Sequence, residues 1–158
     1  MDHLADPVFD EPMTPLEEWE NSILSQRPEW DDYFLAIAKV VSTRSDCTRR
    51  KIGSVITRDN RIVATGYNGA PSGEPGCVDL PCPRSRSSVE PGSSYDTGAG
   101  ACIAIHSEAN ALLYADRDKC QGATIYISDE PCDGCLKLIK GAGIAKVVSP
   151  TSEFDLNG

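Results

Sequence analysis

A histidine and a glutamate two residues apart, followed downstream by a pair of cysteines, are the residues of this chain best suited to chemistry. They are His106 and Glu108, then Cys132 and Cys135 in the spacing C-x-x-C, with Pro131 before the first cysteine. One imidazole and two thiolates are zinc ligands, and three protein ligands leave the fourth tetrahedral position open to water. The carboxylate of Glu108 is then free to move protons. The pattern therefore predicts a catalytic zinc centre.

Each half of this pattern has a plainer interpretation by itself. C-x-x-C also occurs in structural zinc knuckles and redox pairs, and a single histidine at a helix start is usually a cap or a core group. The two halves together, in this order and between predicted strands, are far more specific. Both fall at predicted helix N-termini, where partial positive charge favours thiolates and anions. A zinc-binding scaffold without activity would not need Glu108.

Hydrophobic periodicity predicts a layered α/β domain around these residues. The expected order is α-β-β-α-β-α-β. Asp59-Asn60 supplies the turn of a hairpin, and a long loop rich in Gly, Pro, Ser and Cys follows the second strand. Helices are expected over 30–41, 105–117 and 132–140, and strands over 51–57, 61–65, 123–128 and 144–148.

The acidic character of the chain is concentrated in its first residues. The 158 residues carry a net charge of −9, and residues 1–30 hold eight acids and one base. We therefore divide the chain into an acidic extension, 1–28, with the composition of a disordered segment, and one domain, 29–158. A short helix can begin at Pro15, and Trp19 and Leu24 could instead pack against the body or a neighbouring subunit. The nearly neutral body lacks the positive field that duplex or long-RNA binding needs.

The sequence also indicates a cytoplasmic protein. Its first residues lack the basic region and apolar stretch of a secretory signal, and no apolar run has the length to span a membrane. Seven cysteines in such a chain are expected to serve as metal ligands or free thiols, not as disulfides.

Several longer runs carry a family resemblance together with the metal pattern. Residues 47–56, 61–73, 121–128 and 142–148 resemble the zinc-dependent deoxycytidylate deaminases of the cytidine/deoxycytidylate deaminase superfamily. The resemblance implies a three-layer α/β/α domain with a mixed central sheet and hydrolysis of dCMP to dUMP with release of ammonia. It also implies a homo-oligomer, commonly a hexamer, and in some members activation by dCTP and inhibition by dTTP.

The resemblance also implies roles for residues around the metal. Asn68 would bond the sugar hydroxyl, although a loop asparagine can equally satisfy backbone groups. The Ser107 backbone N–H would bond the base carbonyl. The family usually has alanine at this position, so a hydroxyl here is expected to affect which base is preferred. Arg49, Arg50 and Arg84 are candidate phosphate contacts, the alternative being a solvated basic patch.

Two departures from the family pattern leave other functions open. The chain ends soon after the fourth predicted strand, where the superfamily usually adds a fifth strand and a helix, and the acidic extension lies outside the shared pattern. One alternative is a deaminase of another small cytosine compound, such as a modified nucleotide, a nucleoside or an antibiotic. A tRNA adenosine deaminase would need a basic surface and a shorter loop.

Four further cysteines predict a second, structural zinc. Cys47 precedes the first strand, Cys77 and Cys82 lie in the long loop, and Cys102 closes it. A closed site of four thiolates is a common structural arrangement for zinc. The spacing of the loop pair is wider than in a common knuckle, and the alternative is four reduced thiols buried as small hydrophobes. Cys120 is left unassigned.

Overall fold

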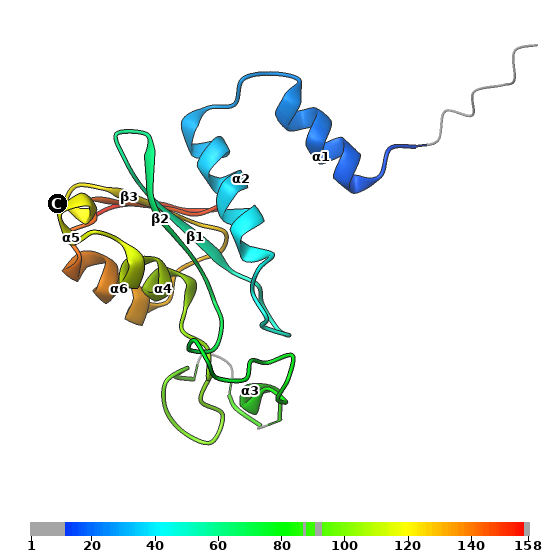
Figure 1. Cartoon of the computed structure of the whole chain (residues 1–158), viewed down its shortest axis with the longest axis vertical. Helices are drawn as coiled ribbons and strands as arrows, with labels where there is room; N and C mark the ends of the chain where they lie inside the picture. Colours follow the sequence, from blue (N-terminus) through cyan, green and yellow to red (C-terminus); the bar gives the residue numbers. More distant parts are fainter. Residues whose placement is uncertain (1–11, 87, 91–92, 157–158) are drawn as a thin grey trace, which may run out of the picture.

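The computed structural model describes residues 12–86, 88–90 and 93–156, which form one mixed sheet flanked by helices (Figure 1). The strand order is β2-β1-β3-β4-β5. Strands β3 and β4 are parallel, and the other neighbouring pairs are antiparallel. The strands are β1 (Gly53–Arg58), β2 (Arg61–Tyr67), β3 (Thr124–Ile127), β4 (Lys146–Val148) and β5 (Glu153–Asp155).

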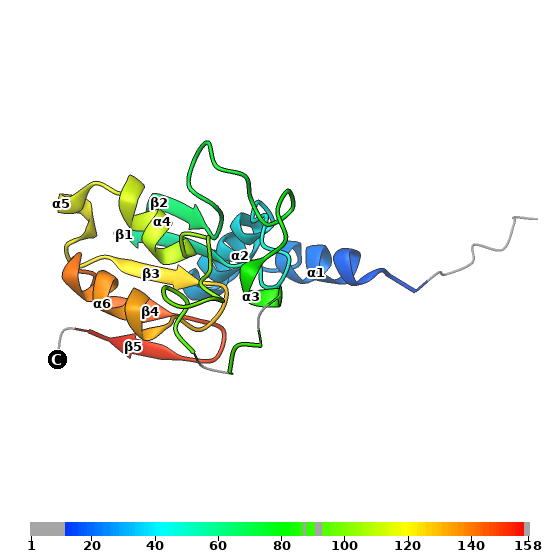
Figure 2. The ribbon, with the colours of Figure 1, turned by 90° about the horizontal axis from the view of Figure 1, so that it is seen from below.

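Helix α2 (Trp30–Ser42) covers one face of the sheet, and helices α4 (Ser107–Tyr114) and α6 (Asp133–Gly141) cover the other (Figures 1 and 2). Because side chains alternate along a strand, the three central strands, β1, β3 and β4, each contribute to two cores. The core under α2 contains Phe34, Ala38, Val55, Tyr126 and Val148. The core under α4 and α6 contains Ala111, Ile139, Ile56, Ile125, Ile127 and Val147. The predicted three-layer α/β/α architecture with a mixed sheet is confirmed.

Two glycines let helices approach the sheet closely. A Cβ at Gly53 would lie 2.2 Å from the Ala38 carbonyl oxygen of α2. A Cβ at Gly66 would lie 2.3 Å from both the Ser107 carbonyl oxygen and the Ala111 nitrogen of α4. Gly66 therefore allows the first turn of α4, which carries His106 and Glu108 at its start, to rest directly on β2.

The hairpin turn is confirmed, whereas the predicted helix over 105–117 is wrong at both ends. Asp59 and Asn60 have φ of 51° and 56°, as the tight hairpin requires. His106 is the extended N-cap of α4, and the helix ends at Tyr114. A separate turn, α5 (Arg117–Cys120), follows because the Asp116 side chain caps it by accepting from the Asp118 N–H.

The C-terminal segment corrects a second expectation. A short fifth strand is present, because residues 153–155 pair antiparallel with β4. No helix follows β5 within the described residues. The predicted helix over 132–140 instead begins at Asp133, with Cys132 as its N-cap, and Gly143 beyond it has a φ of 82°.

The acidic extension contains a helix, α1 (Pro15–Leu24), that projects away from the sheet (Figure 2). It begins with a capping box, in which Glu17 accepts from the Thr14 N–H at 2.8 Å and the Thr14 hydroxyl accepts from the Glu17 N–H. Leu24 is 81% exposed, so it does not pack on the body. Residues 1–11 and the Trp19 side chain lie outside the described part of the chain.

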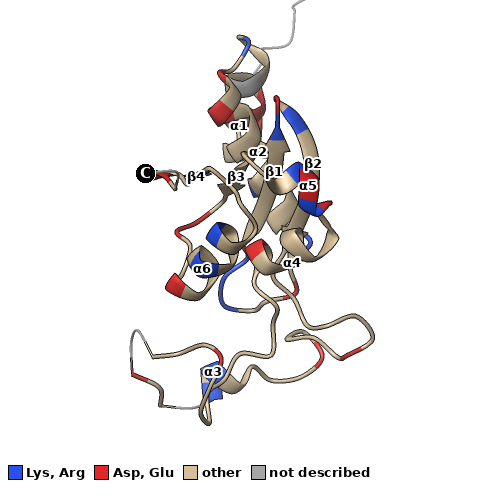
Figure 3. Ribbon diagram, turned by 90° about the vertical axis from the view of Figure 1, so that its left-hand side faces the viewer, with Lys and Arg blue, Asp and Glu red and all other residues tan. Residues whose placement is uncertain are grey.

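The long loop is closed at its base by the backbone. Gly69 and Ile105 exchange two hydrogen bonds of 3.2 and 2.8 Å, so residues 70–104 leave and rejoin the body at one point. The loop contains one short helix, α3 (Pro83–Arg86). Figure 3 shows that Lys and Arg residues are spread over several elements. Within the described residues, no helix is both long and apolar enough to cross a membrane.

Candidate active site and metal centre

The predicted catalytic ligands converge on one point. His106 Nδ1 lies 3.5 Å from Cys132 Sγ and 3.4 Å from Cys135 Sγ. A tetrahedral zinc with its usual bond lengths would place nitrogen and sulfur about 3.5 Å apart. Among the described residues, this is the only group of three or more His, Cys, Asp or Glu whose ligand atoms all lie within 4.8 Å of one another. The spacing and the donor atoms both fit zinc.

The starts of two helices position these three ligands. His106 is the N-cap of α4 and Cys132 is the N-cap of α6, both with extended backbone, and Cys135 lies in the first turn of α6. The Cys135 N–H lies 3.5 Å from Cys132 Sγ. Burial raises the pKa of the Cys135 thiol, and the charges of Glu108 and Cys132 raise it further. A thiolate at Cys135 therefore needs a cation beside it, which zinc supplies.

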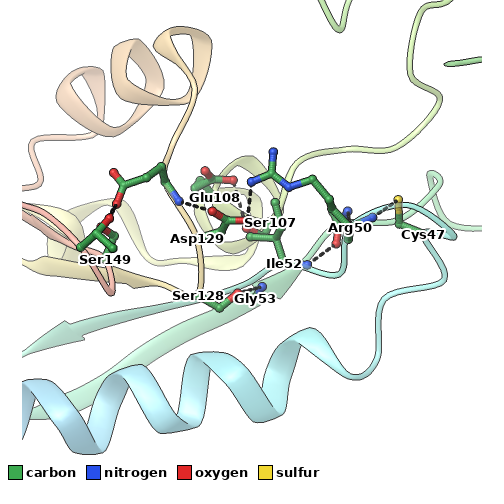
Figure 4. Close-up of polar contacts among 12 residues, drawn as sticks. Cys47, Arg50, Ile52, Gly53, Ser107, Glu108, Ser128, Asp129 and Ser149 are labelled. Carbon is green, nitrogen blue, oxygen red and sulfur yellow. Dashed lines mark hydrogen bonds and ion pairs between the residues drawn. The ribbon is translucent and has the colours of Figure 1, made fainter. Parts of the chain in front are cut away.

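Glu108 lies beside the metal group but is not part of it. Its side chain is buried, and Oε2 accepts a hydrogen bond from the Ser107 hydroxyl at 3.0 Å (Figure 4). Both residues line a cavity of about 280 Å³ together with His106 and Cys132. That volume lies just below the usual range of small-ligand sites, about 300–1,000 Å³. The carboxylate is therefore placed to exchange protons with a small bound molecule.

Asn68 also lines this cavity, but its side chain is held by the backbone. Oδ1 accepts from the Ile52 N–H at 2.8 Å, and Nδ2 donates to the Arg50 carbonyl at 2.8 Å. The Asn68 carbonyl accepts from the Ser45 hydroxyl at 2.7 Å. Asn68 thus ties together three segments at the rim, and one amide hydrogen of Nδ2 is left over. Its bond to a sugar hydroxyl stays a prediction.

Two of the three candidate phosphate contacts lie at the cavity. Arg49 and Arg50 line it, and Arg50 donates to the Asp129 carboxylate across the rim (Figure 4). Burial alone would raise the pKa of Asp129, but hydrogen bonds from Arg50 and the Glu130 N–H outweigh it and hold the pKa below its usual value. The hydrogen bond to Asp129 raises the pKa of Arg50 in turn. The rim therefore carries a fixed ion pair.

Arg84, the third candidate, is engaged within the loop. Its guanidinium donates to the Ser94 and Ser93 carbonyls at 2.7 and 2.8 Å, and it lies 4.0 Å from the ring centroid of Tyr95. Arg84 is 6% exposed and is not among the residues that line the cavity. These contacts are those of a residue that organises the loop.

Tyr95 was missed by sequence reasoning. Its ring packs edge-on against the His106 imidazole, with centroids 5.3 Å apart, and it lines the cavity. The sequence places it in an irregular loop, eleven residues before His106, with no periodicity to indicate its direction. Its position between Arg84 and a metal ligand depends on the folded loop.

Glu130, at the opposite rim, was also missed. Its carboxylate accepts from the hydroxyls of Ser149, Thr151 and Ser152, the last two at 2.5 and 2.6 Å. These hydrogen bonds hold the pKa of Glu130 below its usual value. They fasten the turn between β4 and β5 to the segment before Cys132.

The four remaining candidate cysteines are neighbours, but their thiols do not meet at one point. Burial, followed by the neighbouring charges of Cys82, Cys47, Asp46 and Cys102 in that order, raises the pKa of Cys77 to about 11. No three of these sulfur atoms lie within 4.8 Å of one another. Cys120, which had no predicted role, is buried in the core under α4 and α6.

This site defines a class, an open three-ligand zinc centre with a free carboxylate in an α/β/α domain, and comparison with known proteins places the chain in a family. Residues 28–151 match the family model described as the cytidine and deoxycytidylate deaminase zinc-binding region. The deoxycytidylate deaminase of Mycobacterium phage D29 is 53% identical over 125 residues, 78% of this chain and 96% of that protein. The Schizosaccharomyces pombe deoxycytidylate deaminase is 42% identical over 127 residues. The matched region is 80% of this chain but only 38% of that relative.

A solved structure agrees with the sequence comparisons. The crystal structure of dCMP deaminase from cyanophage S-TIM5 in complex with dCMP and dUMP has a TM-score of 0.59 and 27% identity. The match covers 78% of this chain and 82% of that one. The chain belongs to the cytidine and deoxycytidylate deaminase family of zinc-dependent hydrolases.

Proposed function

We propose that this protein hydrolyses dCMP to dUMP and releases ammonia. The observation that carries the proposal is the carboxylate of Glu108 beside the His-Cys-Cys metal group, in a cavity of about 280 Å³ lined also by Arg49 and Arg50. The phage D29 relative is named for this activity, and the cyanophage structure has dCMP and dUMP bound.

The protein's own residues account for the proton movements. Bound zinc supplies the Lewis acidity that makes water nucleophilic near neutral pH. Glu108 accepts one proton from the attacking water and delivers it to the ring nitrogen. It then takes the second proton from the new hydroxyl on the ring carbon and gives it to the leaving amine. Ammonia departs as the carbonyl of the uracil ring forms. The Ser107 backbone N–H, at the start of α4, donates a hydrogen bond to the carbonyl of the base and so orients the base.

Residues at the rim of the cavity select the substrate. The unused amide hydrogen of Asn68 bonds the sugar hydroxyl while its other bonds keep the side chain fixed. Arg49 and Arg50 bind the phosphate, and Asp129 holds the Arg50 guanidinium in place for it. Arg84 contributes by keeping Tyr95 in place at the cavity wall, since its own donors are taken up by loop carbonyls.

A substrate panel tests this proposal. The zinc-loaded protein is incubated with dCMP, CMP, deoxycytidine, cytidine and tRNA, and turnover is followed by cytosine absorbance and ammonia release. We expect dCMP to give the highest kcat/KM, and we expect tRNA to give no product. Equal activity on dCMP and deoxycytidine would remove the phosphate role of the arginines. A higher rate on another cytosine compound would favour the alternative branch of the family.

A second, structural zinc held by the loop cysteines is also part of the proposal. It is supported by the mutual proximity of Cys77, Cys82, Cys47 and Cys102. The Asp46 Oδ1 atom, buried and without a hydrogen-bond partner among the described residues, lies in the same cluster. The thiols would have to move closer together on binding. Metal analysis should return two zincs per chain for wild type and one for Cys77→Ser, and one zinc in fully loaded wild type would contradict the second site.

The remaining elements of the proposal concern assembly and location. We place the protein in the cytoplasm as a homo-oligomer, a hexamer by family resemblance, with dCTP and dTTP as candidate effectors. Light scattering of the full chain measures the assembly. Initial rates with dCTP or dTTP added at subsaturating dCMP measure the regulation, and unchanged rates with both would exclude it.

A further inference from the structure

Two serines from distant parts of the chain meet beneath Glu108. Ser54 lies on β1 and Ser107 opens α4, and their hydroxyl oxygens are 2.7 Å apart. Both residues are fully buried, at 0% and 1% exposure. Ser107 Oγ also lies 3.0 Å from Glu108 Oε2. Figure 4 draws these two side chains next to each other. The three groups form a continuous chain from a strand of the sheet to the carboxylate.

The direction of these hydrogen bonds follows from the number of hydrogens. A hydroxyl donates one hydrogen bond. The Ser107 hydroxyl donates to Glu108 Oε2, so its single hydrogen is used there. Ser54 must then donate to Ser107, because its hydroxyl has no other partner among the described residues. The central strand thus fixes Ser54, Ser54 fixes Ser107, and Ser107 fixes one oxygen of the carboxylate.

We propose that Ser107, oriented by Ser54, is a positioning residue that holds the Glu108 carboxylate for proton transfer. Oε2 is engaged by the Ser107 hydroxyl, so we assign the proton transfer to Oε1. The inference rests on the proposed deaminase function, in which Glu108 carries protons between water and the base. The hydroxyl thereby acts on the rate of the reaction and not on the choice of base.

Kinetics and stability measured together separate this role from a structural one. Ser107→Ala should lower kcat by about 10-fold with KM within about twofold, because the lost bond acts after substrate binding. It should also lower Tm by about 2–12 °C, since it leaves the Ser54 hydroxyl buried without a partner. The double variant Ser54→Ala/Ser107→Ala should recover most of that Tm but none of the kcat. Ser107→Thr, which keeps the hydroxyl, should retain kcat within about threefold.

A matched control is Ser42→Ala. Ser42 is buried and donates to the Lys39 carbonyl at 2.7 Å, in α2 on the opposite face of the sheet. The Ser42→Ala variant should have a lower Tm and an unchanged kcat. A kcat for Ser107→Ala within twofold of wild type would overturn the proposal, as would a double variant whose kcat recovers with its Tm.

A structural readout keeps this test independent of the substrate. The crystal structure of zinc-loaded Ser107→Ala should show the Glu108 carboxylate in more than one orientation, and a single wild-type orientation would overturn the inference. If wild type does not turn over dCMP, the proposed function fails, and the structure of the variant still decides the role of Ser107.

Discussion

Replacing Asn68 by alanine removes two hydrogen bonds that hold the backbone before β1. The Ile52 N–H loses its acceptor and the Arg50 carbonyl loses its donor, both at 2.8 Å in the wild type. Asn68 is 7% exposed, so water does not simply replace its amide. Leaving one buried polar group unpaired costs about 1–3 kcal/mol. Because the Arg50 carbonyl belongs to a more exposed residue, we expect a total of about 2–4 kcal/mol.

The expected loss can be measured on the zinc-loaded protein. For a domain of this size, about 2–4 kcal/mol corresponds to a fall in Tm of about 4–16 °C. Thermal and urea unfolding should agree on it. The kcat/KM for dCMP should fall as well, because the same segment carries Arg49 and Arg50 at the cavity rim.

Asn110→Ala is the matched control for this prediction. Asn110 makes one comparable bond, from Nδ2 to the Tyr67 carbonyl at 2.8 Å, and it lies inside α4, where alanine is a better helix former. Asn110→Ala should lower the free energy of unfolding by less than about 1 kcal/mol. A Tm for Asn68→Ala within about 2 °C of wild type would refute the structural reasoning. A large Tm loss with unchanged kcat/KM would refute the substrate contact.

Three further predictions test the site and its support. Glu108→Gln should retain zinc and lower kcat by about 10⁴-fold, since the amide cannot accept the water proton, and turnover within tenfold of wild type would contradict the proton-carrying role. Gly66→Val should lower both Tm and kcat, because its side chain would collide with the backbone of α4, and a variant with normal values would show that α4 does not depend on this contact. Glu130 has a lowered pKa in the folded protein, so its contribution to stability is present above its unfolded pKa of about 4.3 and is lost as pH falls through the folded value. The difference in Tm between wild type and Glu130→Gln should therefore shrink from about pH 6 to about pH 3, and a constant difference would exclude this linkage.

The metal group and the layers of the fold could be predicted because they depend on local patterns. The metal group was predicted from three residues, His106, Cys132 and Cys135. Each lies at or next to a helix start, so the direction of its side chain is set by the local backbone. Short runs rich in apolar residues identified the strands, and Asp59-Asn60 identified the hairpin. The H-x-E motif, the C-x-x-C motif, the strand patterns and the hairpin turn are each contained in a short run of consecutive residues.

The features that sequence reasoning missed depend on contacts between distant segments. Nothing near Ser107 in the sequence indicates that its hydroxyl meets Ser54, which lies on another element. Arg84 was assigned to phosphate because its charge is visible in the sequence, whereas the carbonyls that surround it are contributed by a loop without periodicity. β5 is only three residues long, and its pairing with β4 is decided by the turn that Glu130 fastens.

The closed base of the long loop has a consequence for how this enzyme could be changed. Glu108 and the three zinc ligands lie outside residues 70–104, whereas Tyr95 and two candidate ligands of the second zinc, Cys82 and Cys102, line the cavity from within them. Because Gly69 and Ile105 fix both ends of that excursion to each other, the segment can be exchanged as a cassette without altering the register of β2 or α4. Grafting loops of other lengths between these two residues is therefore a direct way to build deaminases with new substrate ranges on an unaltered catalytic frame.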